Sequence, residues 1–128
     1  MAGFKNQEFI IVRYVEHDGE GEGHSANDPL PLADGNLNAP ITADMVVTDA
    51  SFEVSVALAG TTALNVGTAA DADGYVANAD ITLGTPGVYS TASPALVSTR
   101  QAAGQLQLDV TGTSTAGSGI VVIRGYMA

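Results

Sequence analysis

The fold is decided by residues 105–127, which read QLQLDVTGTSTAGSGIVVIRGYM. In residues 105–111, leucine and valine alternate with polar side chains, a period of two that is typical of a β-strand with one buried face. Residues 120–127 are rich in β-branched side chains and present apolar residues on both faces. Residues 112–119 between them (GTSTAGSG) are glycine, serine and threonine except for one alanine. We therefore expect a turn there and an antiparallel hairpin.

The same period of two recurs earlier in the chain, with a predicted inward face made of Phe52, Val54, Val56 and Leu58. Residues 7–16 (QEFIIVRYVE) are apolar on both faces, which predicts a strand covered on two sides by a second sheet or a neighbouring subunit. No segment shows sustained helical spacing of apolar residues. We therefore expect an all-β fold, an antiparallel β-sandwich (jelly-roll-like or immunoglobulin-like) of about seven or eight strands, with a small barrel as the alternative.

The length and the residue composition of the chain predict one domain. The 128 residues fall in the usual size range of single domains. We expect residues 45–128 to form the main sandwich and residues 7–16 to add one strand to it. Residues 17–42 contain glycine, proline, asparagine and aspartate throughout, which predicts an extended loop or arm that contacts another surface.

Composition excludes several classes of protein. The chain has 14 acidic and 4 basic residues, a net charge of −10, and so few cations cannot neutralise a nucleic-acid backbone. No apolar run reaches the roughly 20 residues of a membrane span, and the first residues lack the apolar core of a signal peptide. The absence of cysteine excludes disulfides, thiolate metal sites and a cysteine nucleophile. We therefore expect neither a nucleic-acid partner nor a membrane.

No catalytic constellation emerges from the sequence. The serine-rich residues 112–119 lack the G-x-S-x-G order of a nucleophile elbow, and no G-K-[ST] phosphate loop exists. Because the chain has 14 acidic residues, pairs of nearby carboxylates in the sequence do not indicate a catalytic acid and base. We expect no enzyme activity, no catalytic residues and no cofactor.

Two acidic stretches contain the residue types that bind metal ions. Residues 17–24 (HDGEGEGH) combine histidine and carboxylates, but their spacing fits a solvated loop better. Asp71 and Asp73 begin like a calcium loop, and Asp80 could complete an irregular site, yet valine replaces the glycine that such a loop needs. An acidic β-turn is the favoured interpretation, with these three aspartates as secondary calcium candidates.

The scarcity of basic residues makes the arginines informative. Arg13 and Arg124 each lie in the middle of a predicted strand, between apolar neighbours. An inward or interfacial arginine needs a carboxylate partner, because an unpaired buried charge is costly. An ion pair within the fold and a contact with another subunit explain this pattern equally well.

Residues 65–91, NVGTAADADGYVANADITLGTPGVYST, resemble a pattern in small structural proteins of tailed bacteriophages. In that pattern an apolar strand leads into V-G-x-A-x-D-x-D-G, followed by a short D-I/V turn, a G-x-Y strand and a late hairpin rich in glycine, threonine and serine. The resemblance covers residues 46–127, whereas residues 17–40 match no part of it. It implies no catalytic residues.

The resemblance implies a virion component that assembles on a particle surface, often as a trimer or another symmetric oligomer. We therefore expect a decoration or cement protein that is made in the cytoplasm of the bacterial host. It would bind the outer surface of a capsid, with the major capsid protein and copies of itself as partners. The expected contact residues lie in or just before the first strand, in the arm and in the last strand: Phe4, Phe9, Ile11, Arg13, Tyr14, Leu30, Leu32, Leu37 and Arg124.

Two other functions remain open. Tail and head–tail connector components also use β-sandwiches with long loops, and they differ from a shell decoration in copy number. A calcium-dependent adhesion or carbohydrate-binding module would use the three aspartates to organise a binding loop. The absence of tryptophan weakens the carbohydrate reading, because large aromatic rings stack on sugars.

Overall fold

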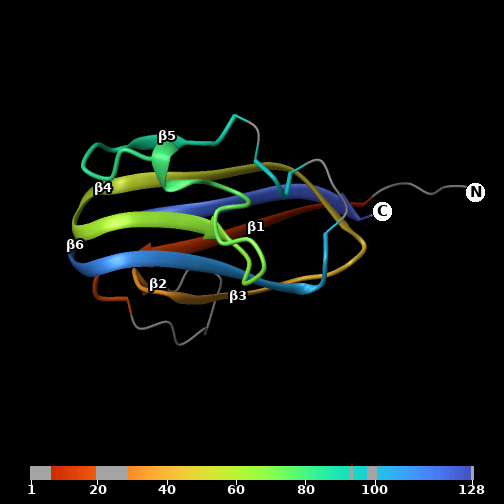
Figure 1. Ribbon diagram of the computed structural model, residues 1–128, viewed down its shortest axis with the longest axis horizontal. Coiled ribbons are helices and arrows are strands. Elements are labelled where there is room, and N and C mark those ends of the chain that lie inside the picture. Colours follow the sequence, from red (N-terminus) through yellow and green to blue (C-terminus); the bar gives the residue numbers. More distant parts are fainter. Residues whose placement is uncertain (1–6, 20–28, 93, 98–100, 128) are drawn as a thin grey trace, which may run out of the picture.

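A computed structural model describes residues 7–19, 29–92, 94–97 and 101–127. The elements in chain order are β1 (Gln7–Glu16), β2 (Leu30–Pro31), β3 (Gly35–Ile41), β4 (Met45–Gly67), the 3-10 helix η1 (Asn78–Asp80), β5 (Gly87–Tyr89) and β6 (Gly104–Met127). The strands form one mixed sheet in the order β2-β1-β6-β4-β5, with β3 also paired to β6 (Figure 1). The prediction of an all-β fold is confirmed. The sheet differs from the predicted antiparallel one because β1 and β2 are parallel, and the described residues form six strands.

Two long strands dominate the molecule. β4 has 23 residues and β6 has 24, and they pair antiparallel from Met45–Met127 to Gly67–Gln107. Both strands bend at the same end of the molecule, on the left of Figure 1, and run back from there. The first part of β4 and the last part of β6 join β1 and β5, whereas the start of β6 joins β3. The sheet is therefore folded back on itself.

Glycines make this bend possible. Gly60, Gly112 and Gly117 have φ angles of 81°, 94° and 110°, values that side chains rarely adopt. A Cβ atom on Gly112 would also lie 2.3 Å from the carbonyl oxygen of Gly60, so the close approach of the strands excludes a side chain there. Residues 112–119 are thus the middle of one strand, and the predicted hairpin with its turn is wrong.

Two segments of the predicted arm at residues 17–42, Leu30–Pro31 and Gly35–Ile41, belong to the sheet. β2 pairs in parallel with the end of β1, and β3 pairs antiparallel with β6. Side chains add to this pairing, because the Val110 N–H donates to Asp34 Oδ1 and Gln107 Nε2 donates to Asn36 Oδ1 at 3.0 Å. The arm prediction is corrected for residues 29–41, and residues 20–28 lie outside the described residues.

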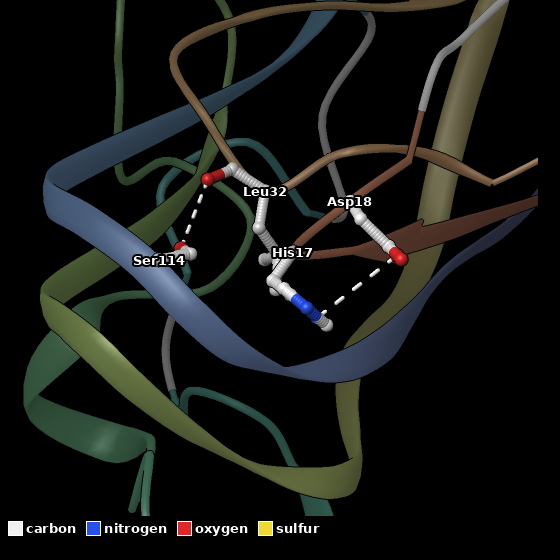
Figure 2. Close-up of polar contacts among 4 residues, drawn as sticks. All are labelled: His17, Asp18, Leu32 and Ser114. Atoms are coloured by element: carbon white, nitrogen blue, oxygen red, sulfur yellow. Dashed lines mark hydrogen bonds and ion pairs between the residues drawn. The ribbon is translucent and has the colours of Figure 1, made fainter.

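Polar contacts fasten this segment to the bend of β6 (Figure 2). Ser114 Oγ donates to the Leu32 carbonyl oxygen at 3.0 Å, and the hydroxyls of Ser114 and Thr61 lie 2.5 Å apart. The His17 ring reaches the Asp18 carboxylate only at 4.0 Å, and both side chains are exposed, so this pair adds little to stability. The hydrogen bonds of Ser114 with Leu32 and Thr61 therefore hold this segment against the bend of β6.

One apolar core lies on the inward face of the folded sheet. Several of its largest fully buried side chains come from β3, β4, β6 and the β4–β5 connection: Leu37, Phe52, Leu64, Tyr75, Leu106 and Ile123. The predicted inward face of β4 holds for Phe52, Val54 and Leu58, but Val56 is 56% exposed. A register shift on either side of Val56 turns its side chain outward, which alternation alone does not reveal.

The connection between β4 and β6 is anchored by Tyr75 and Gln101. The Tyr75 hydroxyl donates to Gln101 Oε1 at 2.6 Å, and Gln101 Nε2 donates to the Leu96 carbonyl oxygen at 2.6 Å. The Gln101 N–H in turn donates to the Met45 carbonyl oxygen at 3.0 Å. Burial raises the pKa of Tyr75 to about 12. These bonds tie the long connection to the start of β4.

Candidate interaction surface

The outward face of β1 and β6 carries apolar side chains that the core does not use. Paired residues of antiparallel strands project to the same face, so the register of β1 on β6 brings their even-numbered side chains together. Ile10 is 54% exposed, and its apolar neighbours are half-buried. We call this group the outer strip, and it consists of Ile10, Val12, Tyr14, Ile120 and Val122.

Arg124 is the basic residue at one end of the outer strip. It is exposed and pairs in register with Ile10 on β1 and Asp49 on β4. Within the described part of the chain its guanidinium makes no hydrogen bond and no ion pair, so the carboxylate partner that we expected is absent there. The guanidinium is therefore available to a carboxylate or carbonyl oxygen of another molecule.

Two shallow, open depressions flank Arg124. The first lies over β6, β4 and β5 and is lined by Asp49, Ser51, Glu53, Val88, Ser90, Val122 and Arg124. The second lies toward β1 and is lined by Glu8, Phe9, Ile10, Thr48, Arg124 and Gly125. Small-molecule sites are normally enclosed, so these two open depressions are better suited to contact with the surface of another protein.

Arg13 lies on the inward side of β1, and its guanidinium is engaged within the chain. Its Nε and Nη2 donate to the carbonyl oxygens of Leu37 and Asn38, both at 2.8 Å, and its Nη1 donates to the Val12 carbonyl oxygen at 2.9 Å. The predicted carboxylate partner is replaced by backbone carbonyls. Arg13 thus links β1 to β3 and is a structural residue.

The other predicted contact residues divide between the two faces. Tyr14 and Arg124 both lie on the outward face, whereas Phe9 and Ile11 pack half-buried against the core. Phe4 lies outside the described residues. Three predicted contact residues are buried in the chain's own core and offer no surface to a partner, which corrects their assignment: Leu30, Leu32 and Leu37.

The three aspartates that we considered for calcium do not form a single cluster, although Asp71 and Asp73 are in contact. Asp71 closes a turn in which its carbonyl oxygen accepts from the Gly74 N–H at 3.1 Å. A hydrogen bond with the Asp73 side chain raises the pKa of the Asp71 carboxyl. Asp80 lies in η1, where Thr91 Oγ1 donates to it at 2.8 Å. In the ranges that the structure describes, no group of three or more histidine, aspartate or glutamate side chains is placed to hold a metal ion.

Comparison with known proteins adds a similarity of fold. No protein-family model matches the chain, and no curated protein matches its sequence. No helix among the described residues is long and apolar enough to cross a membrane. The fold is similar to that of a chain in the solved structure of the cyanophage Pam1 capsid asymmetric unit, with a TM-score of 0.65 and 18% identity over 100% of this chain and 90% of that chain.

Proposed function

We propose that this chain is a structural protein of a bacteriophage virion that binds the outer surface of the capsid as a decoration or cement protein. The observation that carries this proposal is the likeness of the complete chain to one chain of a cyanophage capsid asymmetric unit. The likeness covers 100% of the present sequence and 90% of that chain, so it is not confined to an isolated motif. The major capsid protein is the proposed partner, and the virion is the proposed location.

The mechanism is associative. A protein that binds the assembled shell and not its separated subunits stabilises the shell by mass action. The outer strip supplies apolar contact area, and Arg124 supplies one charge-assisted hydrogen bond. Because the chain carries a net charge of −10, a shell surface that binds it should be apolar or basic around the contact.

Two structural features belong to the same proposal. The two halves of the folded sheet form the two layers of a β-sandwich, and one core cluster between them supports this description. The chain also forms a symmetric oligomer on the particle. The sequence resemblance implies a trimer, whereas the open edge of β1 allows a two-fold dimer instead.

The test adds the purified chain to shells that lack it and measures co-sedimentation and the melting temperature of the shell. We expect the chain to bind and to raise that melting temperature. Val122→Glu should weaken binding at least tenfold, because it places a charge in the outer strip. Gln105→Glu is the matched control: it adds the same charge to the other half of β6, at an exposed position, and should bind normally.

Circular dichroism must show that both variants remain folded. Failure of the wild-type chain to bind the shells would contradict the proposed function. Equal binding by the two variants would contradict the role of the outer strip.

A further inference from the structure

β1 is an edge strand over most of its length. On one side it pairs with β6 along all ten residues, from Gln7–Met127 to Glu16–Ser118. On the other side β2 pairs only with Val15 and Glu16. Among the described residues, no strand pairs with residues 7–14 on that side. A long, regular edge of this kind is a template for another strand.

Hydrogen bonds identify which backbone groups face the open side. The His17 N–H donates to the Gly117 carbonyl oxygen of β6 at 3.1 Å, so the odd-numbered residues of β1 direct their N–H and C=O groups toward β6. The even-numbered residues direct theirs away from β6. Consistent with this, the Glu16 carbonyl oxygen accepts from the Leu32 N–H on the β2 side at 3.1 Å.

Glu8, Ile10 and Val12 therefore present backbone groups to the open edge. The Val12 carbonyl oxygen already accepts one hydrogen bond from Arg13 Nη1, and its second lone pair can accept another. The side chains along this edge are also incompletely covered. Ile10 is 54% exposed on the outward face, and Ile11 packs only half-buried on the inward face. An added strand would cover apolar side chains on both faces.

The other edges of the sheet do not match β1. β2 has two residues and β5 has three. The part of β4 beyond β5 is covered by the β4–β6 connection, where the Leu58 N–H donates to the Leu83 carbonyl oxygen and the Val66 N–H to the Val76 carbonyl oxygen. β3 is longer, but its register shifts between Asn36 and Pro40, Asn38 has a φ of 55°, and Pro40 has no N–H to donate. Among the described strands, the edge that matches β1 in length and regularity is β1 of a second copy. Two identical edges pair antiparallel about a two-fold axis.

We propose that two copies of this chain associate through β1, with the two-fold axis at Ile10. Ile10 of one copy then lies opposite Ile10 of the other, and Glu8 lies opposite Val12. Each of these pairs exchanges two backbone hydrogen bonds. The pairing would join the two sheets into one continuous sheet. It requires no capsid, so it stands or falls separately from the proposed function.

Charge favours this register. Each copy carries −10, yet residues 9–15 contain no acidic side chain. The two Glu8 side chains are offset by four residues, about 13 Å along the strands, which exceeds the Debye length of about 8 Å at physiological ionic strength. The open edge is therefore a place where two acidic copies can meet without direct repulsion.

The test uses cysteine cross-linking of the full chain, which has no cysteine of its own. Ile10→Cys places two thiols on directly opposed residues, with Cα atoms about 5.5 Å apart, within the range that a disulfide spans. Val12→Cys is the control for register, because its two copies would lie about 13 Å apart. Val88→Cys is the control for collision, because Val88 is 68% exposed on a different edge.

Under mild oxidation, Ile10→Cys should form covalent dimers at least tenfold faster than either control. Equal rates for all three variants would overturn the proposal, and faster linkage of Val12→Cys would overturn the register.

Sedimentation equilibrium without any cysteine gives a second measurement. The wild-type chain should sediment as a dimer of 12.9 kDa subunits. Ile10→Pro should sediment as a monomer, because proline removes an N–H that faces the open edge and not β6. A wild-type monomer, a wild-type trimer or an unchanged Ile10→Pro dimer would each overturn the proposal. A wild-type monomer whose binding to shells is abolished by Ile10→Pro would assign the edge to a shell protein instead.

Discussion

Arg13 shows how one side chain can replace missing pairing between strands. β1 and β3 do not pair, yet Arg13 donates to two carbonyl oxygens of β3 and to one of β1. Arg13→Met keeps the apolar stem but leaves these acceptors without their donor. We expect the free energy of unfolding in urea to fall by about 1–3 kcal/mol. Arg124→Met, at an exposed position, should change it by less than about 0.5 kcal/mol; equal effects would contradict the structural role of Arg13.

Tyr75 makes the stability depend on pH in the alkaline range. Its pKa is about 12 in the folded chain, because burial disfavours the phenolate, against about 10 for an exposed tyrosine. The unfolded chain therefore loses its proton first. Stability is fully present below about pH 10 and is lost as the pH rises from about 10 to 12, by about 2–3 kcal/mol.

Urea titrations at several pH values measure this loss. Tyr75→Phe should lower the free energy of unfolding at pH 7 by about 1–2 kcal/mol, because Gln101 Oε1 loses a donor. It should also remove the part of the alkaline loss that comes from Tyr75. Tyr126→Phe, on the outward side of β6, is the control and should retain that loss. The same alkaline profile in both variants would contradict the account of Tyr75.

At the scale of elements, the bend in β4 and β6 determines the architecture. Gly112 has a φ of 94°, and a Cβ atom there would meet the Gly60 carbonyl oxygen. Gly112→Ala should therefore destabilise the fold by about 2 kcal/mol or more. Gly104→Ala, in the same strand, meets nothing within 4 Å and should be neutral or slightly stabilising. Thermal unfolding of both variants measures this difference, and Gly112→Ala should have the lower melting temperature. Similar melting temperatures would contradict the role of the bend.

The sequence predicts strands better than it predicts their connections. The alternation of apolar and polar residues correctly predicts that Phe52 and Leu106 face the core, because a strand with one buried face places every second side chain there. Residues 112–119 look like a turn because glycine and serine suit turns and bends alike. Pairing with β4 decides between these structures, and that pairing is not local in sequence. Residues 29–41 also resemble a loop in the sequence, because glycine, asparagine and proline surround Leu37. In the structure, however, Leu37 lies in strand β3.

At the scale of the whole molecule, the sequence indicates that β1 is apolar on both sides but not which side faces the core. The structure places Phe9 and Ile11 inward and leaves Ile10 and Tyr14 outward, because the neighbouring strands supply the core on one side only. The outer strip therefore combines residues of β1 and β6 that lie more than 100 positions apart in the chain. Local patterns could not bring them together.

As a decoration protein, the chain lies on the outside of a phage head. Immunogold electron microscopy of the source particles, with antibody raised against this chain, tests this location. We expect dense and even labelling over the heads of intact particles. Gold confined to the tail or neck, or no gold on any particle, would contradict it.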